Sequence, residues 1–237
     1  MKHLLVTNDF PPKIGGIQSY LWELWRRLPA DETAGLSWVP AGTGVARDFF
    51  NIAPDLPVLD AEKCVGCMEC VTQCPDTAIL AKVVPAAQHA RLLEKLAADP
   101  NSAFLGAQFA KTTKYSDVPA RKGHEGGMFY LMTDPSKCKG CGECVQACGS
   151  HGALKMVQKN AELLGRFRAA ARLYRELPDT PRHYIQDKVL ADIMLKQSTL
   201  LYTGGAASCM GCGEATAIRM MLAATNFVYG EQSAGIV

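Results

Sequence analysis

Apolar residues recur at the spacing of an amphipathic helix in several stretches of the chain. Residues 160–177 have the broadest apolar face, which consists of Leu163, Leu164, Phe167, Ala170, Ala171 and Tyr174. Residues 85–100 have a narrower face, which consists of Ala86, Ala90, Leu93 and Ala97. Residues 184–196 and the segment that begins at Gly213 and Glu214 are also helical in pattern. We therefore predict helices over these four segments and expect the last of them to be buried.

The first 30 residues predict a different unit. "HLLVT" predicts a short strand, "NDFPPKIGG" a loop, and residues 17–29 an amphipathic helix. A strand, a glycine-bearing loop and a helix open many nucleotide-binding α/β folds, and Gly15 and Gly16 lie where the helix N-terminus would receive a phosphate group. A single unit of this kind cannot bury its strand on both faces.

The charge and hydropathy limit the classes of partner that we expect. The 237 residues include 25 Lys and Arg against 23 Asp and Glu, a net charge of +2, so we expect no nucleic-acid partner. No stretch approaches the roughly 18 apolar residues of a membrane helix. The start "MKHLLVTNDFPPK" has too short an apolar run for a signal peptide. We therefore expect a cytoplasmic protein without a membrane partner.

Ten cysteines change this picture, because eight of them lie in two short runs. "CVGCMECVTQCP" begins at Cys64 and "CKGCGECVQACG" begins at Cys138, and the remaining pair is Cys209 and Cys212. Disulfides are rare in a reducing cytosol, where clustered cysteines more often bind metal or perform redox chemistry. The cysteines therefore predict a metal or redox centre.

The two runs belong to a longer internal repeat with an offset of 74 residues. The matching pairs are Asp60 and Asp134, Lys63 and Lys137, Gly66 and Gly140, Glu69 and Glu143, Val71 and Val145, Leu80 and Leu154, and Val83 and Val157. Such a repeat indicates a duplicated supersecondary unit. We expect the two copies to pack about a pseudo-twofold axis, with short β-hairpins and a short helix after the last cysteine of each run.

The spacing C-x2-C-x2-C-x3-C in each run is the bacterial ferredoxin pattern for a [4Fe–4S] cluster. In two-cluster ferredoxins the fourth cysteine of each run ligates the other cluster. The first predicted ligand set is Cys64, Cys67, Cys70 and Cys148. The second predicted ligand set is Cys138, Cys141, Cys144 and Cys74. We expect Gly66 and Gly140 to relieve crowding near inorganic sulfur, and Pro75, whose counterpart is Gly149, to turn the chain after its ligand.

Zinc and disulfides are the alternatives to iron–sulfur clusters. Zinc needs only two C-x-x-C pairs and gives no reason for a third and fourth cysteine at these offsets. Disulfides between cysteines three residues apart would be strained. With both ligand sets complete, we expect His89 and His124 to be surface or packing residues. The predicted chemistry is single-electron transfer, with no substrate bound at iron.

From about residue 45 onward the chain resembles pyruvate:ferredoxin oxidoreductase and related 2-oxoacid:ferredoxin oxidoreductases. The resemblance rests on the two cysteine runs, the long segment between them and "CMGCGE", residues 209–214. In that family a two-cluster ferredoxin-like domain precedes a thiamine diphosphate-binding domain that opens with this element. The resemblance implies that Cys209 and Cys212 are two of the four ligands of a third [4Fe–4S] cluster. It also implies oxidative decarboxylation of a 2-oxoacid with coenzyme A, with ferredoxin or flavodoxin as the electron acceptor.

Two features depart from that family. No cysteine follows Cys212, and no G-D-G element for Mg²⁺ and diphosphate occurs, so thiamine diphosphate and Mg²⁺ are expected only if other chains complete the site. The run "VTNDFPPKIGGIQSY" instead resembles the start of glycosyltransferases of the phosphatidylinositol mannosyltransferase kind, in which Gly16 would approach the diphosphate of a sugar nucleotide. Because only one βα unit is present, we expect a leader without transferase activity.

These elements together predict an α+β fold in four parts. Residues 1–44 are the βα leader, and residues 45–158 are a pseudo-twofold two-[4Fe–4S] ferredoxin-like module with an insertion at 85–130. Residues 159–205 are a helical connector. Residues 206–237 are the incomplete start of a thiamine diphosphate-binding domain. We expect exposed apolar surface in this last part, around Ile218, Met221, Leu222 and Phe227.

The predicted function is an electron relay through two clusters, as a segment of a 2-oxoacid oxidoreductase. A second hypothesis is a subunit of a split oxidoreductase that partner chains complete. The remaining alternatives are a sugar-nucleotide glycosyltransferase fragment and a fusion or truncated chain.

Overall fold

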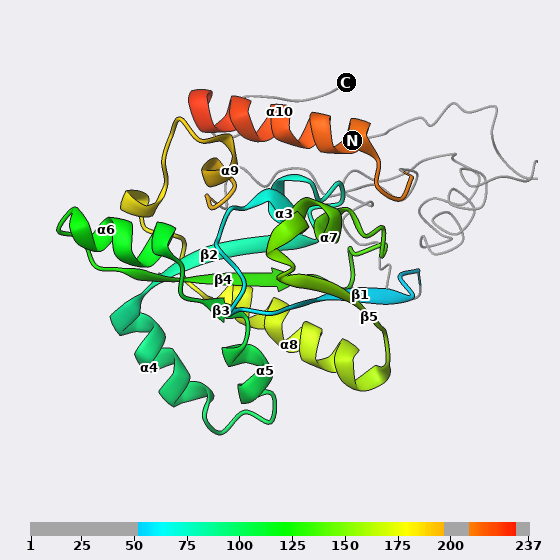
Figure 1. Cartoon of the computed structure of the whole chain (residues 1–237), viewed down its shortest axis with the longest axis horizontal. Helices are drawn as coiled ribbons and strands as arrows, with labels where there is room; N and C mark the ends of the chain where they lie inside the picture. Colours follow the sequence, from blue (N-terminus) through cyan, green and yellow to red (C-terminus); the bar gives the residue numbers. More distant parts are fainter. Residues whose placement is uncertain (1–51, 197–208, 231–237) are drawn as a thin grey trace, which may run out of the picture. The chain divides into compact units, whose positions relative to one another are not determined.

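The computed structural model describes residues 52–196 and 209–230 (Figure 1). The predicted βα leader and its phosphate site at Gly16 lie outside the described residues. The described residues form helices and short antiparallel strands, so the fold is α+β. None of the helices in these two ranges has the length and apolar character needed to span a bilayer.

The strands of the described ranges form two small antiparallel sheets. In the first sheet β1 (Asp55–Leu59) pairs with β5 (Leu154–Gln158). In the second sheet β4 (Gly127–Thr133) lies between β2 (Ile79–Pro85) and β3 (Phe109–Ala110). Each strand that precedes a cysteine run therefore pairs with the strand that follows the other run. The two copies of the repeat are joined through both sheets.

The helical turns of the repeat lie inside the cysteine runs. α3 (Glu69–Thr72) ends just before Cys74, and α7 (Glu143–Cys148) ends at the last cysteine of its run. The expectation that a short helix follows each run holds only after Cys148, where a 3₁₀ turn covers Gly149–His151, and was wrong after Cys74. The α-helical turns lie inside the runs because the x3 spacing between the third and fourth cysteines is itself one helical turn. α3 and α7 pack against each other, on the upper side of the sheets in Figure 1.

The offset between equivalent residues of the two copies increases by one residue after the second run. The amide of Asp60 donates to the carbonyl oxygen of Ala153 at 2.7 Å, and the amide of Asp134 donates to that of Ala78 at 2.6 Å. Since Asp60 and Asp134 are equivalent, Ala78 is equivalent to Ala153, at an offset one residue larger than the sequence repeat.

The predicted equivalence of Leu80 with Leu154 was therefore wrong, since the strand registers match Ile79 with Leu154. The additional residue lies in the 3₁₀ turn that follows Cys148, where Gly149 (φ 52°) stands in place of Pro75. A proline ring fixes φ near −65° and does not permit this turn. A one-residue change matters here because it moves a strand side chain to the other face of its sheet.

α8 (Ala161–Glu176) covers the lower face of the second sheet in Figure 1, away from α3 and α7. The helix predicted over residues 160–177 is thus confirmed, with most of its predicted apolar stripe buried, namely Phe167, Ala170, Ala171 and Tyr174. The Asn160 side chain accepts the amide hydrogen of Leu163 at 2.7 Å and caps the helix N-terminus. At the other end, the buried Lys82 Nζ donates to the carbonyl oxygen of Leu177 at 2.6 Å.

The segment between β2 and β4 is mostly helical. It comprises α4 (Ala86–Leu96), α5 (Ser102–Gly106), β3, a π-helical turn (Thr113–Asp117) and α6 (Val118–Arg121).

α4 packs with a face that differs from the predicted one. Leu92 and Leu96 lie against the core, and the His89 ring lies 4.5 Å from that of Phe109, while Leu93 is exposed. The longer side chains reach the core, whereas the alanines of the predicted face are too short to bury much apolar area.

The helix predicted over residues 184–196 was largely wrong, since only α9 (Leu190–Ile193) is α-helical there. The fully buried Asp192 carboxylate accepts the amide hydrogen of Gln186 at 3.3 Å, the Tyr115 hydroxyl at 3.0 Å and Lys114 Nζ at 2.5 Å. These bonds satisfy the buried acid and hold the chain in a non-helical path.

α10 (Gly213–Tyr229) confirms the helix predicted after Gly213, but its buried face is not purely apolar. That face consists of Ala215, Arg219, Ala223 and Asn226. Met221 is exposed, as expected, whereas Ile218, Leu222 and Phe227 are half-buried.

Candidate metal centres

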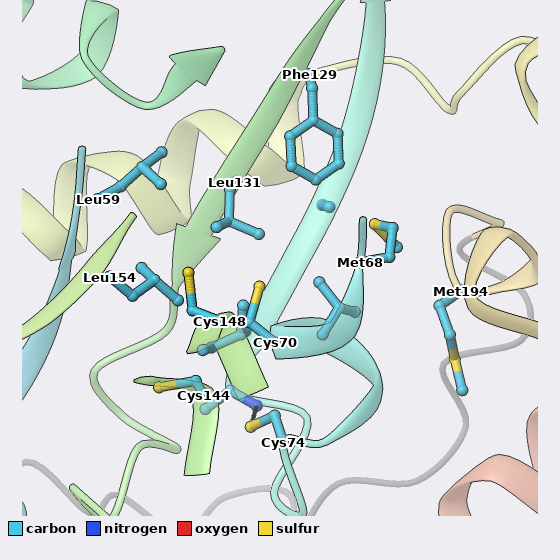
Figure 2. Close-up of a cluster of buried hydrophobic side chains, with 14 of the residues drawn as sticks. Leu59, Met68, Cys70, Cys74, Phe129, Leu131, Cys144, Cys148, Leu154 and Met194 are labelled. Carbon is cyan, nitrogen blue, oxygen red and sulfur yellow. Dashed lines mark hydrogen bonds between the residues drawn. The ribbon is translucent and has the colours of Figure 1, made fainter. Parts of the chain in front are cut away.

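One cavity is lined by cysteines from both runs, and we call it the first cavity. Its four cysteines are Cys64, Cys67, Cys70 and Cys148. Apolar side chains form most of the remaining wall, and Figure 2 shows Leu59, Leu131 and Leu154 around Cys70 and Cys148. The empty volume is about 340 Å³, open solvent included.

A second cavity has the reciprocal composition. Its four cysteines are Cys138, Cys141, Cys144 and Cys74. Its empty volume is also about 340 Å³. In both cavities, then, three cysteines come from one run and the fourth comes from the other. These are the two groups that the ferredoxin spacing predicts.

Cys74 and Cys148, the cysteines that line the cavity of the other run, have matching hydrogen bonds, and we call them the crossing cysteines. The amide of Ala78 donates to Cys74 Sγ at 3.2 Å, and the amide of Ala153 donates to Cys148 Sγ at 3.2 Å (Figure 2 shows Cys74 and Cys148). An amide bond to sulfur favours the thiolate over the thiol, and thiolates are the form that binds metal. The fourth cysteine of each run thus lines the cavity of the other copy, with its sulfur held by an amide hydrogen bond.

The thiols of each cavity surround a space instead of converging on one point. All ten cysteines are free thiols. In the described ranges, no three His, Cys, Asp or Glu side chains lie close enough together to hold a single metal ion. A zinc site requires four ligand atoms within about 2.3 Å of one centre. The four-thiol cavities fit a cuboidal cluster with iron at separate corners better than they fit one zinc ion.

Burial raises the pKa of several of these thiols and so favours their protonated form. It raises the pKa of Cys64 and Cys70 in the first cavity. In the second cavity burial raises the pKa of Cys138 and of Cys144 to about 12. Binding of a metal cluster must therefore displace protons from the cysteines.

Residues 63–153 match the family model for the 4Fe-4S dicluster domain. The chain thus has a segment that is similar to the iron–sulfur dicluster domain. It is 28% identical over 200 residues to a probable pyruvate-flavodoxin oxidoreductase of Escherichia coli (strain K12), which covers 82% of this chain and 15% of the relative. It is also 28% identical over 176 residues to a pyruvate-flavodoxin oxidoreductase of Rhodospirillum rubrum, covering 72% of this chain and 13% of the relative.

A third relative carries a different name. Pyruvate dehydrogenase [NADP(+)] of Cryptosporidium parvum is 26% identical over 201 residues, which are 82% of this chain and 9% of the relative. The chain spans about one seventh or less of the length of these relatives. The dicluster segment is thus similar to a small part of much larger oxidoreductases.

Two equivalent glycines shape the loops of the dicluster segment. Gly66 and Gly140 have φ of 69° and 74°, in the left-handed region that favours glycine. A Cβ at Gly66 would lie 3.0 Å from Tyr115 Cε2, and one at Gly140 would lie 3.2 Å from the carbonyl oxygen of Asp55. The protein itself therefore crowds these positions, in addition to the predicted crowding near inorganic sulfur.

The surroundings of the two cavities differ in charge. Asp76 and Lys139 line the second cavity and form an ion pair of 2.9 Å, in which both side chains are less than 5% exposed. The lining of the first cavity contains His151 as its one titratable residue besides cysteine. The second cavity thus has a polar, charged wall that its counterpart lacks.

A buried arginine from α10 adds a further charge at the end of α3, close in sequence to Cys74. Arg219 is 1% exposed, and its Nη2 donates to the carbonyl oxygens of Val71 and Thr72, the latter at 2.5 Å. Burial raises the pKa of the Cys74 thiol, while hydrogen bonding by the Ile79 amide and the charge of Arg219 lower it. Sequence reasoning missed Arg219, although its spacing of four from Ala215 and from Ala223 placed it on the apolar face of the helix.

The third cysteine pair has a different environment. Cys212 Sγ accepts the amide hydrogen of Ala215 at 3.5 Å, so this cysteine caps the N-terminus of α10. Gly211 lies beside α7, because a Cβ there would be 2.8 Å from Glu143 Oε1. Cys209 is exposed. The ligation of a third cluster by Cys209 and Cys212 stays a prediction.

Proposed function

We propose that the eight cysteines of the two runs bind two [4Fe–4S] clusters and that this segment relays single electrons within a 2-oxoacid oxidoreductase. The observation that carries the proposal is the exchange of the fourth cysteine between the two cavities. The 4Fe-4S dicluster match over residues 63–153 supports the same cofactor.

The protein's own contribution is to bind and enclose the clusters. A [4Fe–4S] cluster supplies a carrier that gains or loses one electron. Four thiolates per cavity hold it, and the amides of Ala78 and Ala153 orient the crossing thiolates. Apolar side chains form most of the wall of the first cavity, which would limit the solvent contribution to the potential of its cluster.

The exchange of ligands and strands supports a pseudo-twofold ferredoxin-like module as the structural unit. On this proposal the module occupies residues 45–158, and the helical segment after β2 is its insertion. Residues 159–205 connect it to residues 206–237, the start of a thiamine diphosphate-binding domain.

The substrate and the electron partner are inferred from the relatives. Their names combine pyruvate with flavodoxin, which supports a 2-oxoacid such as pyruvate as the electron source. Flavodoxin or ferredoxin is then the acceptor, and the cytoplasm is the proposed location. Because the chain spans about 15% of the first relative, decarboxylation with thiamine diphosphate and Mg²⁺ requires protein beyond these 237 residues.

A second candidate is a subunit of a split oxidoreductase. It is favoured by Cys209, Cys212 and the 17-residue helix α10, which would contribute part of a third cluster to a partner chain. A partner that supplies the missing cysteines would then restore pyruvate-dependent reduction of a viologen dye in an anaerobic mixture.

The test of the leading proposal is anaerobic reconstitution of the full chain with iron and sulfide. We expect about eight irons and eight labile sulfides per chain, four of each per cluster. Electron paramagnetic resonance of the reduced protein should show two interacting spins of one half. A content of about two metal ions, all zinc, would overturn the proposal.

A further inference from the structure

We propose that Arg219 raises the reduction potential of the cluster in the second cavity. This inference rests on the proposed function, because it requires a cluster held by Cys74 and the second run. Arg219 would act on the cluster only through its charge, without contact to the electron partner.

The first argument is the place of the guanidinium group. Its Nη2 donates to the last carbonyl groups of α3, those of Val71 and Thr72. Thr72 lies two residues before Cys74, so the guanidinium group lies beside the segment that carries this cysteine. The Thr216 hydroxyl, one helical turn earlier in α10, also donates to the carbonyl oxygen of Gln73, at 3.5 Å. α10 therefore contacts the segment that leads into the crossing cysteine.

The second argument is that the charge is not compensated by an acid. Arginine stays protonated in proteins. Within the described parts of the chain, no carboxylate forms an ion pair with Arg219. Its Nε atom is buried without a hydrogen-bond partner there. A buried and incompletely paired cation is destabilising, so its presence beside a redox centre calls for a function.

The third argument concerns the other charged residues of the second cavity. Lys139 is paired with Asp76 at 2.9 Å, so this pair adds almost no net charge. Arg219 does not line the cavity itself, but its guanidinium group binds the carbonyl oxygen of Thr72, two residues before the crossing Cys74, and no carboxylate in the described ranges neutralises it. The first cavity has only apolar side chains and His151 in its wall besides cysteines.

The expected direction follows from charge conservation. Reduction adds one electron from the reductant to the cluster, breaks no bond and moves no proton to or from Arg219. The reduced cluster carries one more negative charge, which a nearby cation in a low-dielectric site stabilises. Removal of that cation makes reduction harder and lowers the potential.

The test is a redox titration of the reconstituted full chain with dithionite, followed by electron paramagnetic resonance. Arg219→Met removes both the charge and the hydrogen bonds, Arg219→Gln keeps an amide donor without the charge, and Arg219→Lys keeps the charge. We expect the Met and Gln variants to lower the potential of the second cluster by about 60 mV or more, a tenfold change in the one-electron equilibrium constant. The Lys variant should retain most of the wild-type potential.

Two controls assign the effect. Cys138→Ser identifies which potential belongs to the second cluster, and Arg172→Met removes an exposed arginine of α8 and should change neither potential. Equal second-cluster potentials in wild type and in the Gln variant, with about eight irons in both, would overturn this inference alone. If the Met variant fails to fold, the Gln and Lys variants still decide the question. A wild-type chain without iron would overturn the proposed function and this inference with it.

Discussion

The first and second cavities share a ligand arrangement and differ in what surrounds it. In each, three cysteines come from one run and one comes from the other, and an amide lies 3.2 Å from the crossing sulfur. Each cavity is also lined by a glycine with a positive φ, Gly66 in the first and Gly140 in the second. These shared features all belong to residues that the duplicated unit supplies.

The differences come from residues outside the repeat or changed within it. Tyr115, from the segment between β2 and β4, packs against the loop of the first cavity. Arg219, from α10, binds the end of α3 just before Cys74, which lines the second cavity. Lys139 follows Cys138 directly, while the equivalent position after Cys64 is Val65. The duplication thus accounts for the ligand geometry, whereas residues changed within the repeat and residues of unrepeated segments determine the polarity around each cavity.

The largest expected effect comes from the substitution of a crossing cysteine by alanine. Cys74→Ala should remove or degrade the cluster of Cys138, Cys141 and Cys144 and leave the other intact, because its thiol lines the cavity of the second run. Cys148→Ala should do the reverse. Iron and sulfide analysis with electron paramagnetic resonance measures both outcomes.

Cys209→Ala is the matched control for these two variants and should retain about eight irons. If Cys74→Ala instead damaged the cluster held by its own triplet, the ligand exchange would be disproved.

The next effect concerns the ion pair of the second cavity. Lys139→Met should lower the free energy of unfolding by about 3–5 kcal/mol, because it leaves the Asp76 carboxylate buried without its cation. Denaturant titration of the reconstituted protein under anaerobic conditions measures the change.

The double variant Lys139→Met with Asp76→Asn should recover much of this loss, since no uncompensated charge stays buried. The apolar Val65 at the equivalent position of the first cavity indicates that the fold does not require a lysine there. A loss in the single variant no larger than in the double variant would contradict this account of the pair.

Much of the candidate site could be predicted because it depends on local spacing. The offsets within each run specify which cysteines group together, and the structure gathers them around two cavities in that way. The stripe of α8 was also predictable, since a regular apolar face over four turns has one obvious way to pack. Iron ligation itself stays a prediction.

The rest depended on long-range contacts that periodicity does not contain. α4 turned Leu92 and Leu96 inward because the size of a side chain, not its hydropathy alone, decides what reaches the core. α9 is short because Asp192 binds groups from a segment more than 70 residues earlier. The same holds for Arg219, whose hydrogen-bond acceptors lie in α3.

The smallest expected effect is on the thermal midpoint of variants with alanine in place of a glycine. The comparison is between the two loop glycines, Gly66 and Gly140, and a third glycine outside the cavities. Gly123 also has a positive φ, of 78°, but a Cβ there would meet nothing within 4 Å. Gly123→Ala should therefore incur only the left-handed penalty of about 1–2 kcal/mol. For a chain of this size, that lowers the thermal midpoint by about 2–8 °C.

Gly66→Ala and Gly140→Ala should lower the midpoint further, because each adds a close contact, and overpacking costs about 1–3 kcal/mol. The larger change should be at Gly66. Its new Cβ would lie 3.0 Å from the Tyr115 ring, which a hydrogen bond to Asp192 and stacking on Phe129 hold in place. Gly140 meets the backbone of β1 at a longer distance, 3.2 Å. Thermal unfolding of the three reconstituted variants ranks them, and equal midpoints for Gly66→Ala and Gly123→Ala would show that Tyr115 does not restrict the first loop.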